Sequence, residues 1–132
     1  AIVDACERDL LTAFGLRTLA PGCVGYCGRC EGDVVHRDSA YHQGTVWPWL
    51  MAAFVDAWLR VRGETPEAMA EARVRFLPPL REHLHDAGLG HVSEIFDGDP
   101  PHTPRGCPFQ AWSLAALLRL EQRLAPPAIP ES

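Results

Sequence analysis

The feature that most constrains the fold of this chain is the separation of helix-like hydrophobic patterns by two long segments rich in glycine and proline. Seven glycine and proline residues lie within 15–44, and Asp, Gly, Pro and His dominate 89–106. Gly and Pro interrupt helices, and connections this long inside a compact domain are usually functional. We therefore expect helices that hold two ordered, functional loops, of which 15–44 could include a short hairpin.

Four other segments place apolar residues at three- and four-residue intervals, so that these residues share one face of a helix. The predicted helices cover about residues 2–14, 45–62, 65–86 and 108–124. Thr45 is expected to cap the second helix, and Pro78-Pro79 to break or kink the third before a short helix over 80–86. No convincing strand pair is present, so the predicted class is all-α.

Length and composition fit one small globular domain, because 132 residues with 47% hydrophobic side chains can form a single core. No apolar stretch approaches the roughly 20 residues of a membrane helix. Net charge is −5 and all twelve basic residues are scattered arginines, which argues against a nucleic-acid-binding face. These features predict a cytoplasmic enzyme portion over 1–125 that binds neither membrane nor nucleic acid, and a disordered tail over 126–132.

The end of the first loop mixes aromatic rings with polar side chains between residues 37 and 49. Sugars require both, because their C–H faces stack on aromatic rings and their hydroxyls need hydrogen-bonding groups. The candidate sugar-binding residues are Arg37, Asp38, Tyr41, His42, Gln43, Trp47 and Trp49. The alternative is that Trp47 and Trp49 anchor the core at the start of a helix.

The second loop concentrates charged side chains over a short stretch. These are Glu94, Asp97, Asp99, His102 and Arg105. A carboxylate beside the apolar pair at 95–96 can have a shifted pKa and serve as a general base. One alternative is a solvated turn with Asp97-Gly98 at its tip. The other is a calcium loop, but the twelfth position counted from Asp97 is Pro108, where such a loop needs Glu.

Five cysteines are present, an odd number that argues against a complete disulfide framework. The three cysteines at 23, 27 and 30, with His36 behind them, could bind zinc, but a second spaced pair of ligands is missing. We therefore expect no metal and no cofactor. Three histidines, at 83, 85 and 91, lie at or beyond the end of the third helix, which we expect to be exposed; there they favour the helix dipole and need no ligand role.

Three motifs carry a resemblance to a known family. Residues 41–49 read YHQGTVWPW, and residues 15–19 read GLRTL. Residues 93–102 read SEIFDGDPPH and are followed by RGC at 105–107 and QAWS at 110–113. In this order, and over about residues 3–121, these motifs resemble bacterial and archaeal glycogen debranching enzymes of the amylo-α-1,6-glucosidase family.

The resemblance implies an (α/α)6 barrel, a toroid of twelve helices, of which this chain would supply four to five as the C-terminal portion of the catalytic domain. It implies hydrolysis of the α-1,6-linked glucose stub at glycogen branch points, with inversion. Inversion requires two carboxyl groups about 6.5–9.5 Å apart. The resemblance assigns the general base to Glu94. The family's acid, an Asp, lies upstream of the matched segment, so the isolated chain is expected to be inactive.

We expect Asp97 and Arg105 to join the first-loop residues in binding an α-glucan. The other expected partner is the remainder of the catalytic domain, or a second copy of the chain in its absence. Relatives usually have Pro, Asp, Tyr and Gly where this chain has its cysteines at 23–30, so the geometry there does not follow from the resemblance. Two other functions stay open: a non-catalytic carbohydrate-binding helical module, and another (α/α)6 α-glucosidase such as a trehalase-like enzyme.

Overall fold

The computed structural model describes residues 1–126, and within this range the chain forms five helices and four two-residue strands. The elements are, in order, α1 (Ile2–Asp9), β1 (Leu16–Arg17), α2 (Val34–Ala40), β2 (Val46–Trp47), α3 (Leu50–Val61), α4 (Pro66–His83), β3 (Ile95–Phe96), β4 (Pro104–Arg105) and α5 (Ala111–Arg123). The fold is therefore helix-rich, as predicted, but it is not all-α.

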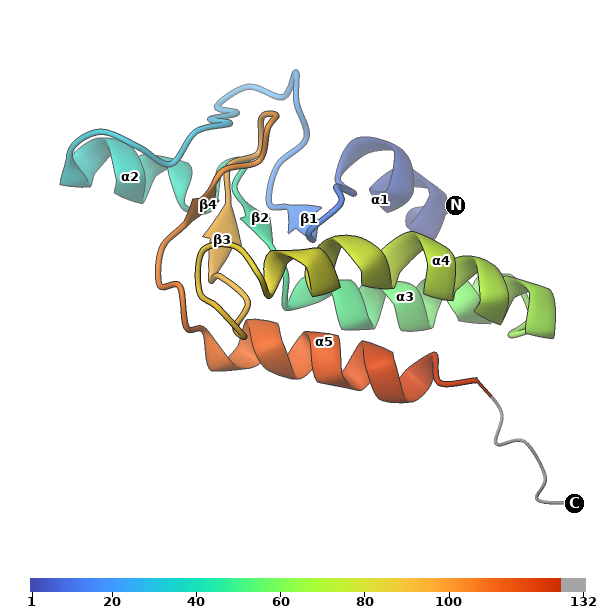
Figure 1. The fold of residues 1–132 in the computed structure, drawn as a ribbon. Coiled ribbons are helices and arrows are strands. Elements are labelled where there is room, and N and C mark those ends of the chain that lie inside the picture. Colours follow the sequence, from blue (N-terminus) through green and yellow to red (C-terminus); the bar gives the residue numbers. More distant parts are fainter. Residues whose placement is uncertain (127–132) are drawn as a thin grey trace, which may run out of the picture.

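The three long helices α3, α4 and α5 contact one another, and α1 packs against α3. Figure 1 shows α3, α4 and α5 side by side, with the strands and α2 gathered at one end of this helical layer. The core between them includes the fully buried Trp58, Leu77 and Leu120, each on a predicted apolar face. Burial of such side chains stabilises the fold by roughly 1.5–3 kcal/mol each.

The prediction that the chain has no strand pair was wrong. The four strands form one antiparallel sheet in the order β1-β2-β3-β4, with Val46 opposite Phe96 and Ile95 opposite Arg105. A two-residue strand is too short to show the alternation by which strands are recognised. The sheet joins the two long loops, because β1 and β2 flank the first loop and β3 and β4 lie within the second.

Two predicted helix boundaries differ from the structure for a common reason, the pairing of neighbouring residues in the sheet. The first helix ends at Asp9 instead of continuing to residue 14, since Leu11 pairs with Leu16. The helix predicted over 45–62 corresponds to α3, which begins at Leu50 instead of Thr45. The Thr45 hydroxyl does not cap this helix and instead donates to the carbonyl oxygen of Ala40 at 2.6 Å.

Of the break or kink predicted at Pro78-Pro79, the break was wrong, because α4 runs without interruption from Pro66 to His83. The two prolines lack the N–H groups that would bond to the carbonyls of residues 74 and 75. Both of those residues are exposed, so water can satisfy their carbonyls. Leu77 and Leu80 are buried on either side of the prolines, and their packing holds the helix together.

The helix α2 was missed inside the segment predicted to be a loop. Its N-cap is Asp33, whose side chain accepts a hydrogen bond from the backbone N–H of His36 at 2.9 Å. Such a cap is a recognised helix start signal, but α2 has only seven residues and too little periodicity to be detected.

The remaining predictions concern the chain end and the membrane. Apart from Pro126, the tail predicted over 126–132 lies outside the described residues. Within the described part of the chain, no helix combines the length and apolarity needed to cross a bilayer.

Candidate functional site

Glu94 lies immediately before β3, and donors from both loops hold its carboxylate. The Tyr41 hydroxyl donates to Glu94 Oε1 at 2.5 Å, and the Cys107 backbone N–H donates to Oε2 at 3.0 Å. A longer bond from the Gln110 amide reaches Oε1 at 3.4 Å. The Glu94 side chain is partly exposed. Its carboxylate is therefore oriented by neutral donors and still open to further hydrogen bonds.

Tyr41 follows the last residue of α2 and is itself held by aromatic neighbours. Its ring meets those of His42 and Trp47 edge to face, with centroids 4.9 Å and 4.8 Å away. Partial burial and the hydrogen bond to Glu94 raise the pKa of Tyr41 well above its usual value. The phenol therefore stays protonated at neutral pH and remains a donor to Glu94.

A polar pocket of about 530 Å³ opens beside this pair, between the start of α2 and the end of the second loop. Its lining combines opposite charges from both long loops. The lining residues are Cys30, Glu31, Gly32, Arg37, Asp38, Tyr41, Ile95, Arg105 and Gly106. The structure therefore brings four predicted sugar-binding residues, those at 37, 38, 41 and 105, to one cavity beside Glu94.

Asp97 was predicted to bind substrate, but its carboxylate is only 1% exposed and lies behind this pocket. It accepts hydrogen bonds from Arg105, with Nη2 at 3.0 Å, and from the Cys30 backbone N–H at 2.9 Å. These bonds to Asp97 raise the pKa of the Arg105 guanidinium. Because a buried charge requires a partner, we assign Asp97 to holding Arg105 and the cysteine loop in place.

A smaller hollow of about 140 Å³ lies next to Tyr41 and is almost entirely apolar. Its lining residues are Thr18, His42, Trp47, Trp49, Leu50 and Trp112. His42 stacks on Trp47 with ring centroids 5.3 Å apart, and Trp49 stacks on Trp112 at 5.5 Å. The hollow offers the aromatic faces that sugar rings need.

The two tryptophans of the first motif have different environments. Trp47 is 4% exposed and belongs to a small core cluster, so its environment fits the alternative interpretation, a core anchor. Trp49 is 40% exposed at the start of α3. Trp112 was missed as a candidate because it lies on the apolar stripe of α5, where the sequence pattern indicates only core packing. Gln43 is exposed and lines neither cavity.

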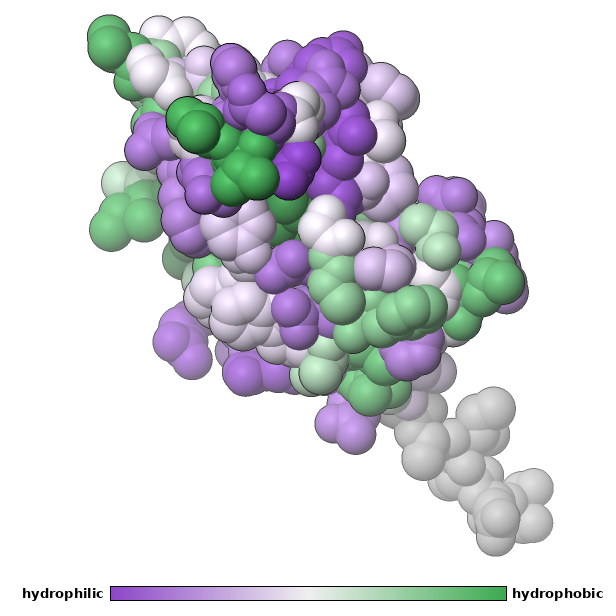
Figure 2. All heavy atoms as spheres, turned by 90° about the vertical axis from the view of Figure 1, so that its left-hand side faces the viewer, coloured by the Kyte–Doolittle hydropathy of each residue, from purple (hydrophilic) through white to green (hydrophobic). Residues whose placement is uncertain are grey.

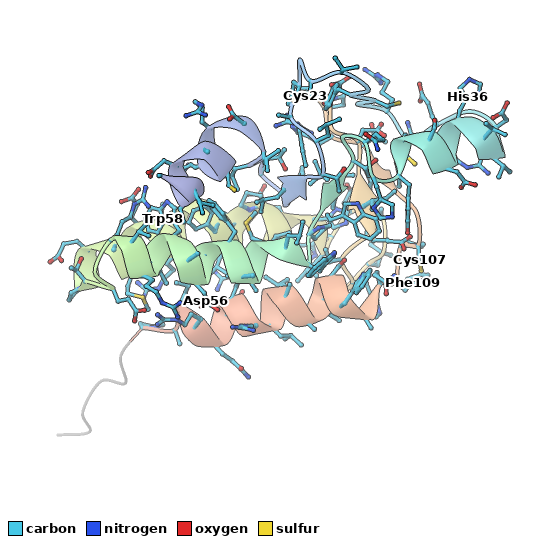
Figure 3. The ribbon with its side chains drawn as sticks, turned by 180° about the vertical axis from the view of Figure 1, so that it is seen from behind. Cys23, His36, Asp56, Trp58, Cys107 and Phe109 are labelled. Atoms are coloured by element: carbon cyan, nitrogen blue, oxygen red, sulfur yellow. The ribbon has the colours of Figure 1, made fainter. Side chains whose placement is uncertain are left out.

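Neither the thiols nor the histidines form a metal site in the described part of the chain. Within it, no cluster of three or more His, Cys, Asp or Glu side chains could hold a metal ion. Figure 3 shows Cys23 and His36 well apart, at the loop and on α2. Cys30 is buried, and its thiol contacts the carbonyl oxygen of Arg37 at 3.6 Å. That no metal is required stays a prediction.

The prediction that His83 is exposed was wrong, since only 3% of its surface is accessible. Its Nε2 lies 3.1 Å from the Ser93 hydroxyl and 3.3 Å from the Ser93 backbone nitrogen. Burial lowers the pKa of His83. The imidazole ties the end of α4 to the residue before Glu94 and so supports the second loop from inside.

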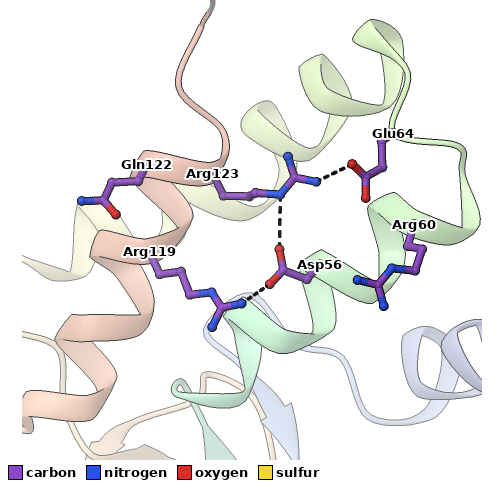
Figure 4. A pocket seen from close by; sticks show the side chains of 6 residues that line it. All are labelled: Asp56, Arg60, Glu64, Arg119, Gln122 and Arg123. Carbon is purple, nitrogen blue, oxygen red and sulfur yellow. Dashed lines mark hydrogen bonds and ion pairs between the residues drawn. The ribbon is translucent and has the colours of Figure 1, made fainter.

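A third pocket, of about 430 Å³, lies toward the C-terminal ends of α3 and α5 (Figure 4). Asp56 pairs there with Arg119 and with Arg123, and Arg123 also pairs with Glu64 at 2.9 Å. These ion pairs join α3 to α5. Most of the pocket's charges neutralise one another, so we regard it as a structural feature.

A polar pocket beside an aromatic hollow, with an oriented carboxylate between two loops, has the character of a carbohydrate site. A family model described as amylo-alpha-1,6-glucosidase matches residues 1–119. This chain therefore belongs to the amylo-α-1,6-glucosidase family, and the resemblance of its motifs to glycogen debranching enzymes is confirmed.

Proposed function

We propose that this chain carries the base-bearing part of an inverting glucosidase site that removes α-1,6-linked glucose stubs from glycogen-like α-glucans. The observation that carries the proposal is the placement of Glu94. Its carboxylate is fixed by donors from both motif-bearing loops, and its neighbours Tyr41, Ile95 and Gly106 line the polar pocket. The family match gives the reaction class with which this geometry agrees.

In the proposed reaction, Glu94 accepts a proton from a water molecule that attacks the anomeric carbon from the face opposite the leaving oxygen. A carboxylate has about four acceptor positions, and Tyr41, Cys107 and Gln110 occupy some of them. The remaining positions are available to the attacking water. The proton for the leaving oxygen would come from a second carboxyl group in the remainder of an (α/α)6 catalytic domain.

We further propose which groups bind the glucose. Arg37, Asp38 and Arg105 line the polar pocket and would bind hydroxyls, whereas His42 and Trp49 would offer ring faces from the hollow. Gln43 could join them only through a rearrangement of its segment, because it lines neither cavity. Tyr41 lines the polar pocket and packs against His42 and Trp47 of the hollow, so glucose in either cavity would lie close to it.

The test is Glu94→Gln in the complete enzyme, assayed by glucose release from an α-glucan that bears single-glucose α-1,6 stubs. Loss of a general base is expected to lower kcat by about 10²–10⁴-fold, with glucan binding largely retained. Glu121→Gln, at a surface ion pair of α5 with Arg81, is the matched control and should keep normal turnover. Near-normal turnover by Glu94→Gln together with a collapse in Asp97→Asn would move the base to Asp97.

The isolated 132-residue chain provides a second test. If the acid lies elsewhere in the catalytic domain, this chain should release no glucose even with Glu94 intact. Hydrolysis by the isolated chain would show that both carboxyl groups are within it and would contradict that part of the proposal.

A further inference from the structure

We propose that Tyr41 is a positioning residue that orients Glu94, and that sugar binding is not its main task. This inference rests on the proposed function and adds a role to a residue that the sequence pattern marks only as an aromatic sugar contact. Tyr41 borders the polar pocket, but its hydroxyl proton is directed at Oε1 of Glu94, 2.5 Å away. A phenol has a single proton to donate, so this proton is committed to the carboxylate.

The Tyr41 hydroxyl is held in place by the structure around it. The Trp47 indole N–H donates to the Tyr41 carbonyl oxygen at 3.1 Å, which ties the backbone of Tyr41 to β2. The ring is packed edge to face against Trp47 and His42. Because Trp47 is buried, the position of the phenol is set by the core and does not depend on a bound sugar.

The second loop fixes the other oxygen of Glu94. The Cys107 backbone N–H donates to Oε2, and a Cβ at Gly106 would clash with the same oxygen. The carboxylate is thus held between the two loops, and the Tyr41 hydroxyl provides its short hydrogen bond from the first loop. Without the Tyr41 hydroxyl, only the 3.4 Å contact from Gln110 remains at Oε1, and the carboxylate can turn away from the water it must deprotonate.

The chain contains a matched control for this interaction. Tyr26 donates to Oδ1 of Asp99 at 2.8 Å, also between the first and the second loop. Tyr26 lines neither the polar pocket nor the hollow. Tyr26→Phe and Tyr41→Phe therefore remove the same kind of phenol–carboxylate bond, but only Tyr41→Phe acts on the proposed base.

The experiment compares both variants with the parent in the complete enzyme. Tyr41→Phe is expected to lower kcat by up to about 100-fold, because a small misplacement of a reacting group can slow a reaction by that factor. KM should be nearly unchanged. Tyr26→Phe should leave kcat unchanged. In a Glu94→Gln background, Tyr41→Phe should have no further effect, because its contribution acts through Glu94. A raised KM with normal kcat, or additive losses in the double variant, would overturn the positioning role.

The same series separates this inference from the proposed function. If Glu94→Gln alone keeps full turnover, the proposed base is wrong. If Glu94→Gln is inactive and Tyr41→Phe is fully active, only the positioning role is wrong. Should Tyr41→Phe fail to fold, 4-fluorophenylalanine at position 41 keeps the ring and fills the place of the hydroxyl without supplying a donor. The same fall in kcat is then expected, and a normal kcat would overturn the inference.

Discussion

At the residue scale, two of the three carboxylates of the second loop, Glu94 and Asp97, lie three positions apart and have opposite environments. Asp97 is buried and paired with the guanidinium of Arg105. Glu94 is partly exposed and held only by neutral donors. A carboxylate committed to a buried ion pair is costly to free for proton transfer, whereas one held by neutral donors can still accept a proton. This contrast favours Glu94 over Asp97 as the base.

His83 gives a prediction for the pH dependence of folding. An unfolded His has a pKa of about 6.5, and burial lowers the pKa of His83 in the folded chain. Below pH 6.5 the unfolded state therefore binds a proton that the folded state does not, and the free energy of unfolding should fall as the pH drops. Above pH 6.5 this contribution to stability is fully present. Denaturant unfolding at a series of pH values measures it.

The control for this prediction is His83→Gln, which removes the titrating group and keeps a side chain able to hydrogen-bond to Ser93. The decline of stability below pH 6.5 should become shallower in this variant. An identical pH dependence in parent and variant would show that other groups cause it.

At the element scale, α5 supplies one wall of the core and also exposes apolar side chains. Leu117 and Leu120 are buried against the other helices, whereas Leu118 is 56% exposed and Trp112 is 48% exposed. This agrees with the sequence of α5, in which apolar residues cover more than half of the helix circumference and so need partners on two sides. In the structure α3 and α4 cover one side of α5, and the other side is open.

Two leucines of α5 provide a matched pair for the packing energy. Leu120→Ala removes a side chain that is 1% exposed and should lower the free energy of unfolding by about 2–5 kcal/mol. Leu118→Ala makes the same chemical change at an exposed position and should alter it by less than about 0.5 kcal/mol. Urea denaturation of both variants checks this, and equal losses would contradict the assigned core.

At the scale of the whole molecule, large apolar side chains remain exposed at several places. Val34 and Val35 are exposed on α2, and Phe109, Trp112 and Leu118 on or beside α5. Figure 2, which faces the α2 end, shows hydrophobic groups standing among mostly polar ones. Single exposed apolar side chains are normal on any protein, whereas a large contiguous patch is uncommon on a monomer. The apolar side chains on the open side of α5 agree with the proposal that the chain packs against further parts of a catalytic domain.

The isolated chain is therefore expected to self-associate. Sedimentation velocity at increasing protein concentration should show growth of species larger than the monomer. Leu118→Glu, at the exposed face of α5, should shift the distribution toward monomer without loss of helical content. A parent chain that stays monomeric at all concentrations and melts cooperatively would contradict both the exposed-face argument and the larger-domain proposal.

The sequence by itself determined the features that depend on neighbours along the chain. Apolar residues at three- and four-residue intervals located α3, α4 and α5, because each helical turn carries its own signal. The start of the helix predicted over 65–86 was also readable, and the structure confirms it, because the Thr65 side chain caps α4 by accepting a hydrogen bond from the Ala68 N–H. The motifs at 41–49 and 93–102 identified the family, because a family can be recognised from an ordered series of residues without knowing how those residues are arranged in space.

Only the tertiary structure decided the features that depend on partners far along the chain. The two-residue strands form because Val46 meets Phe96 across fifty positions, and no local pattern encodes such a pairing. The different environments of Glu94 and Asp97 also depend on strand pairing. Tyr41 reaches Glu94 only after the sheet has joined the two loops, and the pairing of β3 with β4 brings Arg105 to Asp97. Trp112 enters the aromatic hollow for this reason too. Burial, and therefore the role of each polar group, is set by contacts that periodicity cannot reveal.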